Sequence, residues 1–197
     1  MQSAKVGHPE SEHKVPFDFA QGRLSTAQGV RLAPLGMTEW LKEKTMWAGT
    51  VESIHVASDA KAPTRALDQA QAIPGVGLEG DRYALKLGTF FKPAPDFELT
   101  LIEGEALDAL KRDYEIELAP GEARRNVVTR GVSLNHLVGR EFRIGDVRIR
   151  GIRLCEPCSH LQALVGRPVI KGLRHRGGLR AQILSAGNIH VGDAVNE

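Results

Sequence analysis

The sequence contains only two cysteines, Cys155 and Cys158, among its 197 residues. Because they lie three positions apart, they are poorly placed to staple a fold, and a reduced, chemical or metal-binding role is favoured over a structural disulfide. No apolar run approaches the roughly 18 residues that a membrane span requires, and the N-terminus lacks the apolar core of a secretory signal. We therefore expect a cytoplasmic protein with no membrane partner.

Aromatic residues make up only 5% of the chain, and the basic C-terminal part has almost none. Between Arg140 and Arg180, ten arginines and lysines face three carboxylates, although the formal net charge of the whole chain is only +2. Modules that bind single-stranded nucleic acid usually interleave aromatic and basic residues. Phe142 is the only aromatic residue in this interval apart from histidines, so the pattern argues against nucleic acid as a partner.

With 42% hydrophobic and 25% charged residues, the chain has an ordinary globular composition. Its length suffices for one good core but not for two large ones. Residues 1–45 show no sustained hydrophobic period, and single apolar residues are scattered there among Gly, Pro, Ser and Gln. We expect a poorly ordered N-terminal tail over residues 1–45 and one domain over residues 46–197.

Several short segments alternate apolar and polar residues, as half-buried strands do. Strand patterns cover Trp47–Val56, Glu98–Ile102 and a hairpin over Phe142–Arg150 that bends at a Gly-Asp pair. Asn188–Val195 repeats the order apolar-Gly-Asp-apolar. Apolar residues at helical spacing predict a helix over Glu103–Tyr114. Short strands with repeated Gly-Asp turns are typical of an antiparallel sheet that closes into a barrel. The predicted fold class is α+β, mainly antiparallel β and barrel-like, with a few short helices.

Both cysteines fall within Asp146–Gly166, where a strand pattern gives way to a short helix pattern. Pro157 fits the first turn of a helix, because a missing N–H costs nothing there, and Gly166 fits its end. This placement predicts Cys158 in the first helical turn. Free N–H groups and the macrodipole favour an anion at a helix N-terminus, so a cysteine there tends to have a lowered pKa and to serve as a nucleophile or metal ligand.

Three uses of this cysteine pair are open. A structural zinc needs about four ligands, and Cys155, Cys158, His160 and the distant His175 would have to supply them. A thioredoxin-type dithiol should open the first helix of a βαβ unit, whereas the strands here look antiparallel. In the third use, Cys158 alone is a soft thiolate that binds a soft metal or carries sulfur, while Cys155 ends the buried strand.

Segments rich in arginine or glycine offer candidate anion sites. The Gly-rich segment Ala72–Ala84 presents Arg82 behind a tight turn and is either a simple turn or an anion-binding loop. Residues 124–126, Arg-Arg-Asn, precede a strand and are either surface or a grip on phosphate or on the edge of a heterocycle. The same choice applies to the Gly-rich basic loop His175–Arg180.

Taken together, these elements resemble the MOSC family, the domain found at the C-terminus of molybdenum cofactor sulfurases and as a stand-alone bacterial protein. The resemblance covers roughly Gly49 to Val195. It rests on five segments in a fixed order, each of them weak alone: GVGLEGDRY, LTLIEGEAL, RRNVVTRGVSLNHLVGREFRIGDVRIRG, CEPCSHL and GNIHVGDAV.

The resemblance implies a mostly antiparallel, barrel-like fold and a molybdopterin-type molybdenum cofactor. It implies that Cys158 binds the molybdenum or carries sulfur towards it. Asp81 and Arg82 match the family's loop after GLxGD, and Arg125 and Asn126 match its Arg-Asn element near the cofactor. Larger eukaryotic sulfurases add an N-terminal pyridoxal phosphate domain, for which we expect no room in this chain. Some stand-alone relatives are linked to the reduction of N-hydroxylated bases and related compounds.

We therefore expect a molybdenum cofactor-binding protein that acts in sulfur transfer or in molybdenum-dependent reduction of N-hydroxylated compounds. Cys158 would be the catalytic thiolate and the metal ligand, and an electron-donor or sulfur-donor protein would be a partner. A carrier of cofactor or sulfur without turnover is the alternative that the sequence does not separate from an enzyme. The residues expected to hold the cofactor are Asp81, Arg82, Arg124, Arg125, Asn126, Arg174, Arg176 and Arg180.

Overall fold

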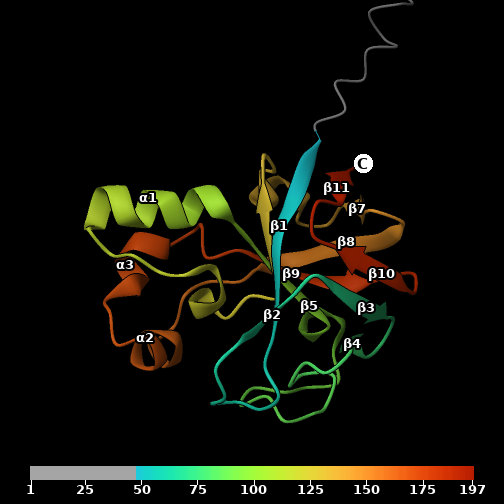
Figure 1. Cartoon of the computed structure of the whole chain (residues 1–197), viewed down its shortest axis with the longest axis horizontal. Helices are drawn as coiled ribbons and strands as arrows, with labels where there is room; N and C mark the ends of the chain where they lie inside the picture. The colour runs from blue at the N-terminus through green and yellow to red at the C-terminus, as the bar shows by residue number, and fades with distance from the viewer. Residues whose placement is uncertain (1–47) are drawn as a thin grey trace, which may run out of the picture. The chain divides into compact units, whose positions relative to one another are not determined.

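The computed structural model describes residues 48–197, whose strands form a barrel with the α-helices gathered on one side (Figure 1). The expected tail, residues 1–45, lies outside the described residues. Within residues 48–197, no helix is long and apolar enough to cross a membrane.

Seven strands form the barrel, in the order β11 (Ala194–Asn196), β7 (Glu141–Ile144), β8 (Val147–Leu154), β9 (Leu179–Ile183), β5 (Leu99–Glu103), β6 (Val127–Arg130) and β1 (Gly49–Val56). The barrel is closed because β1 pairs with β6 on one side and with β11 on the other. Neighbouring strands are antiparallel except for the parallel pair β5–β6. The short strand β2 (Arg65–Leu67) pairs with the C-terminal end of β1.

A second sheet has the order β10 (Gly187–His190), β3 (Gln69–Ile73) and β4 (Gly77–Leu78). The chain turns at Val191 and Gly192, between β10 and β11, and there passes from the second sheet to the barrel, because β10 pairs with β3 whereas β11 pairs with β7 and β1. The hairpin predicted over Phe142–Arg150 is confirmed as β7 and β8, with Phe142 opposite Ile149.

The barrel interior is filled by the alternating apolar residues that the strand patterns contain. In β8, Val147 and Ile149 are buried while Arg148 and Arg150 are exposed. β7 buries Phe142 in the same way. Because successive side chains of a strand point to opposite faces, this alternation sends one apolar set into a single shared core.

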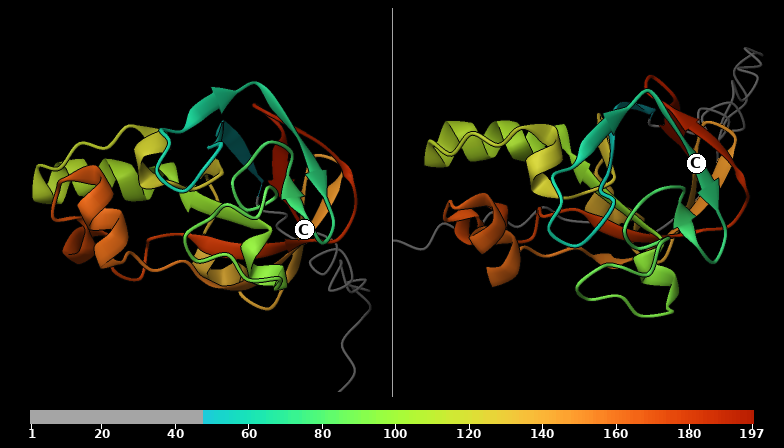
Figure 2. Two further views of the ribbon diagram at one scale, coloured as in Figure 1. Left: turned by 90° about the horizontal axis from the view of Figure 1, so that it is seen from below. Right: turned by 60° about the horizontal axis from the view of Figure 1, so that its bottom comes forward.

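A helical layer covers the outer face of β5 and β6 (Figure 2). Helix α1 (Gly104–Tyr114) links these two parallel strands, and α2 (Ser159–Val165) and α3 (Val169–Leu173) pack beside it. β5 therefore has the barrel core on one face and the helices on the other, and its first four residues are all buried. Short 3₁₀ helices complete the elements, namely η1 (Pro95–Phe97), η2 (Pro120–Ala123) and η3 (Leu134–Leu137).

Candidate functional site

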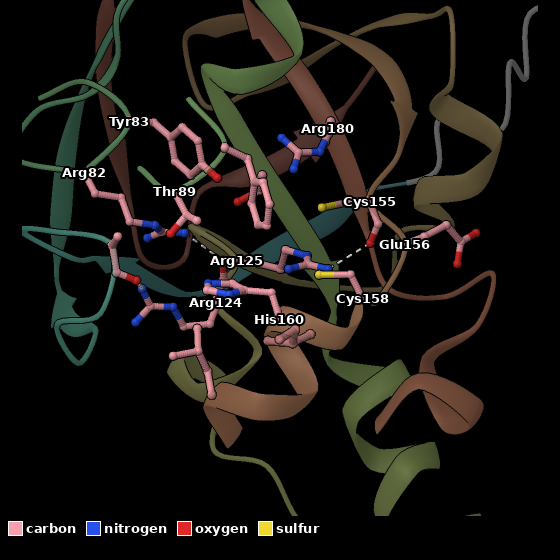
Figure 3. A pocket seen from close by; sticks show the side chains of 15 residues that line it. Arg82, Tyr83, Thr89, Arg124, Arg125, Cys155, Glu156, Cys158, His160 and Arg180 are labelled. Carbon is pink, nitrogen blue, oxygen red and sulfur yellow. Dashed lines mark hydrogen bonds between the residues drawn. The ribbon is translucent and has the colours of Figure 1, made fainter. Parts of the chain in front are cut away.

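A cavity opens where the ends of several strands meet α2 and the loop that follows β4 (Figure 3). Thr100 of β5 and Arg180 of β9, which stand opposite each other in the sheet, both line it. The segment after β8, the residues just before β6 and the first turns of α2 supply the rest of the wall. Five of the residues predicted from the sequence line this cavity: Arg82, Arg124, Arg125, Cys158 and Arg180.

The two cysteines have different environments, although both line the cavity. Cys155 follows the end of β8, is only 4% exposed, and donates its backbone N–H to the Gly178 carbonyl at 2.7 Å. Cys158 is exposed, and its thiol has no hydrogen-bond partner among residues 48–197. The exposed thiol is therefore the one that a ligand can reach.

The predicted position of Cys158 in the first helical turn is wrong by one residue. Its backbone is extended, with φ −136° and ψ 167°, so it is the N-cap, and α2 begins at Ser159. Pro157 then lies before the cap rather than inside the helix. The C-terminal end is as predicted, since Gly166 caps α2 in the left-handed conformation.

Arg125 is a buried clamp on the cysteine segment. Its Nη2 donates to the Cys155 carbonyl at 2.8 Å, its Nε donates to the Gly177 carbonyl at 2.8 Å, and its Nη1 donates to the Ala123 carbonyl at 3.1 Å. Only 7% of Arg125 is exposed. Its guanidinium connects the residues just before β6 to Cys155, which follows β8, and to Gly177, which precedes β9. Arg125 thus fixes the backbone that carries the thiol.

Asn126, predicted to bind the cofactor, is buried behind the cavity wall instead of lining it. Its side-chain oxygen accepts from the Thr100 hydroxyl at 2.7 Å and from the Thr100 N–H at 3.2 Å, and its amide donates to the His55 carbonyl at 3.2 Å. The residue therefore joins β1, β5 and β6 immediately beneath the site.

Asp81 is also buried and does not line the cavity. Its carboxylate accepts the N–H groups of Ala57 at 3.2 Å and Tyr83 at 3.0 Å, and it pairs with the Arg82 guanidinium at 3.3 Å. The other end of that guanidinium donates to the Arg124 carbonyl at 3.3 Å. Asp81 holds the loop, while Arg82 reaches the cavity.

The Gly-rich segment before Asp81 resolves as a turn between strands, because the residues around Gly75 connect β3 to β4. Arg124 lies on the other side of the cavity, with a left-handed backbone at φ 60°. Its guanidinium donates to the carbonyls of Ala60, at 2.8 Å, and Ala62. Burial, together with the nearby positive charge of Arg82, lowers the pKa of Arg124.

Two of the cavity arginines are oriented by aromatic rings, which the sequence did not indicate. The guanidinium carbon of Arg82 lies 5.0 Å from the centre of the Tyr83 ring, and that of Arg180 lies 4.7 Å from the Phe97 ring. The two rings pack on each other with centroids 5.7 Å apart. A cation above each ring is attracted by its quadrupole, so this stack holds both charges at the cavity.

The structure does not bring Arg174 and Arg176 to the cavity, which corrects the expectation that the whole basic loop holds a cofactor. Arg176 donates its Nε to the Gly172 carbonyl at 2.6 Å and lies 3.7 Å from the Asp113 carboxylate. Arg174 lines a separate surface hollow beside α3. Between them, His175 has a left-handed backbone and is held by Glu156, so the turn points both arginines away.

A four-ligand zinc site is not assembled in the part of the chain that the structure describes, where no group of three or more His, Cys, Asp or Glu side chains could hold a metal. His175 is paired with Glu156, through Nδ1 at 3.1 Å, rather than with the cysteines. The cavity is instead strongly cationic. Four arginines line it, and Glu156 is the only carboxylate among the described lining residues. An exposed thiol beside several guanidiniums suits an anionic ligand that also binds sulfur.

Comparisons with known proteins agree with this architecture. The model of the MOSC domain matches residues 89–196. The crystal structure of the YuaD protein from Bacillus subtilis superimposes with a TM-score of 0.64 at 15% identity, covering 77% of this chain and 96% of that one. YiiM from Geobacillus stearothermophilus gives 0.59 at 15% identity, covering 76% and 75%, and YiiM from Escherichia coli gives 0.55 at 18% identity, covering 75% and 68%. No curated protein matches the sequence. At these identities the structural likeness concerns the fold.

Proposed function

Because the chain belongs to the MOSC domain family, which is associated with the molybdenum cofactor, we propose that it binds a molybdopterin-type cofactor through the Cys158 thiolate. The observation that carries this proposal is the cavity itself, in which the exposed thiol of Cys158 shares a wall with four guanidinium groups. Thiolates are suitable ligands for metals that prefer sulfur, and a molybdopterin carries an anionic phosphate.

The residues present fit such a group by the chemistry of their donors. Arg82 and Arg180 each keep N–H groups beyond the one or two that bond within the protein, so they are suited to hold the phosphate. Arg124 adds charge next to Arg82, and a bound anion would relieve the repulsion between these two cations. Arg125 acts indirectly, since its clamp on the Cys155 carbonyl positions the segment that ends in Cys158.

As an enzyme, the protein would reduce N-hydroxylated compounds, in the balanced reaction R–NHOH + 2 e⁻ + 2 H⁺ → R–NH₂ + H₂O. The bound molybdenum would supply the two-electron chemistry, and a donor protein would supply the electrons. The chain itself contributes the thiolate ligand at Cys158, the cationic wall that orients the cofactor, and a pocket for the substrate beside both. Sulfur transfer from Cys158, or carriage of cofactor without turnover, is the alternative that uses the same exposed thiol.

An activity assay tests the enzymatic part of this proposal. Protein from a host that makes the cofactor is supplied with dithionite-reduced viologen and an N-hydroxylated base, and formation of the amine is measured. We expect turnover by the wild type, loss of turnover in Cys158→Ser, and a milder effect in Cys155→Ser, because Cys155 is buried at the end of β8. Cofactor without turnover would identify a carrier, and equal losses in the two variants would point to a dithiol.

A further inference from the structure

The cavity beside Cys158 is lined by two chemically different kinds of side chain. Four are arginines, which offer guanidinium groups. Four others offer rings or apolar groups, namely Phe90 and three residues of α2, His160, Leu161 and Leu164. An anionic cofactor held by the guanidinium groups would leave the rings and apolar groups to contact a second molecule, so a substrate would bind against them.

Phe90 lies on the loop between Arg82 and Glu98, whose two ends are held together. Tyr83 and Phe97 pack together at the two ends of the loop, and the Leu87 N–H donates to the Arg82 carbonyl at 2.7 Å. At the tip, the Phe90 ring stands edge-on against the His160 ring, with centroids 5.2 Å apart and an angle of 86° between the planes.

Core packing does not explain this aromatic pair. Phe90 is 48% exposed, and neither Phe90 nor His160 belongs to the two hydrophobic clusters of residues 48–197. His160 follows Cys158 by two positions, in the first turn of α2. Both rings line the same cavity as Cys158, so a molecule bound beside the thiol can contact this ring pair.

We propose that Phe90 and His160 form a selective wall that favours substrates with a flat aromatic ring over saturated substrates of the same size. A flat ring can stack or pack edge-on against Phe90 in the way His160 does, whereas a puckered saturated ring makes neither contact well. This inference rests on the proposed reduction of N-hydroxylated compounds and names the class of substrate that the same site selects.

The expected size of the effect follows from aromatic pairs in general, which correspond to about a 3- to 10-fold change in affinity beyond the apolar area that they bury. The test compares N-phenylhydroxylamine with N-cyclohexylhydroxylamine, which differ only in the ring, as substrates of the cofactor-loaded protein with reduced viologen. Phe90→Ala removes apolar contact area for both substrates, so the effect of the ring itself is read from the ratio of the two KM values. The preference for the flat substrate in this ratio should fall about 3- to 10-fold.

Two control variants distinguish the effect of the Phe90 ring from a general disturbance of the loop that carries it. Phe90→Tyr keeps the ring and should retain the preference for the flat substrate. Leu85→Ala removes another exposed apolar residue from the same loop, 49% exposed and not lining the cavity, and should change neither KM. Equal changes in the two KM values, or none, in Phe90→Ala would overturn the inference.

A binding measurement keeps the inference testable if the protein turns over neither substrate. Calorimetric titration with benzamide and with cyclohexanecarboxamide compares uncharged flat and saturated rings directly. The wild type should bind benzamide more tightly, and Phe90→Ala should lose that difference. Selective binding without any turnover would support the role of Phe90 and contradict the proposed reductase activity. Turnover without selectivity would contradict only the role of Phe90.

Discussion

Replacing Arg125 by lysine should cost much more stability than a conservative exchange of two cations suggests. The guanidinium donates to three carbonyl groups, on Cys155, Gly177 and Ala123, and all three belong to buried residues. A single ammonium group cannot reproduce this fork, so at least one buried carbonyl loses its partner. An unsatisfied buried group costs about 1–3 kcal/mol, and a hydrogen bond from a charged donor contributes about 1.5–3 kcal/mol. We expect Arg125→Lys to lower the free energy of unfolding by about 2–4 kcal/mol.

Urea denaturation monitored by circular dichroism measures this free energy. The matched control is Arg140→Lys, because the Arg140 side chain is 66% exposed and its contact with Glu197 is as long as 3.8 Å. That exchange should change stability by less than about 0.5 kcal/mol. If Arg125→Lys also stayed within about 0.5 kcal/mol of the wild type, the clamp described for Arg125 would be refuted.

Three further predictions concern residues that support the backbone around the cavity or elsewhere in the fold. Asn126→Ala should lower the free energy of unfolding by about 2–3 kcal/mol in the same urea assay, because the Thr100 hydroxyl and N–H lose their acceptor; a loss below about 0.5 kcal/mol would contradict this role. Burial lowers the pKa of His55, so below about pH 6.5 the unfolded chain binds a proton more readily than the folded protein does. The contribution of His55 to the free energy of unfolding should therefore rise with pH up to about 6.5 and then level off. Urea denaturation from pH 5 to 8 should show a shallower rise in His55→Gln than in the wild type, and an equal rise in both would show that His55 is not the source of the pH dependence. Gly178→Ala should prevent folding, because the added Cβ would lie 2.0 Å from a carbonyl oxygen of β5. The control is Gly166→Ala, where the backbone is also left-handed but the Cβ would meet open space, and this variant should lower the free energy of unfolding by about 1 kcal/mol. Similar yields of folded protein from both variants would show that the close approach at Gly178 is absent.

Local patterns predicted the elements that depend on local rules. The hairpin of β7 and β8 follows from alternating residues around a Gly-Asp bend, and α1 follows from apolar residues at helical spacing. The parallel pairing of β5 with β6 could not be read in this way, because it depends on where α1 places the chain after it leaves the barrel. Likewise, β10 pairs with β3, which lies more than a hundred residues earlier in the chain, and no local pattern indicates this pairing.

Residue chemistry predicted a cationic site but not which cations reach it. Arg176 and Arg180 lie four positions apart and look equivalent in the sequence. Arg180 belongs to β9 and stands opposite Thr100 at the cavity, whereas Arg176 lies in the preceding turn and bonds back to Gly172. Strand register and turn conformation, which are set by distant partners, decide the difference.

The predictions at Asp81 and Asn126 illustrate a second limit. Short polar side chains beside a binding motif can contact a ligand or support the backbone beneath it, and sequence pattern does not separate the two roles. Asp81 accepts from Ala57, 24 residues away, and Asn126 donates to the carbonyl of His55, 71 residues away. The contact between Phe90 and His160 was not predicted, because 70 positions separate these two rings in the chain. His160 entered the sequence analysis only as a possible zinc ligand.

The most direct test of the central claim is elemental analysis for molybdenum and zinc on protein purified from a host that makes the cofactor. The wild type, Cys158→Ser and Cys155→Ser should be compared in parallel, each checked for folding by circular dichroism. Our account predicts near-stoichiometric molybdenum in the wild type, its loss in Cys158→Ser, and its retention in folded Cys155→Ser. Molybdenum retained in Cys158→Ser, or zinc in place of molybdenum in the wild type, would contradict a cofactor site built on the exposed thiol.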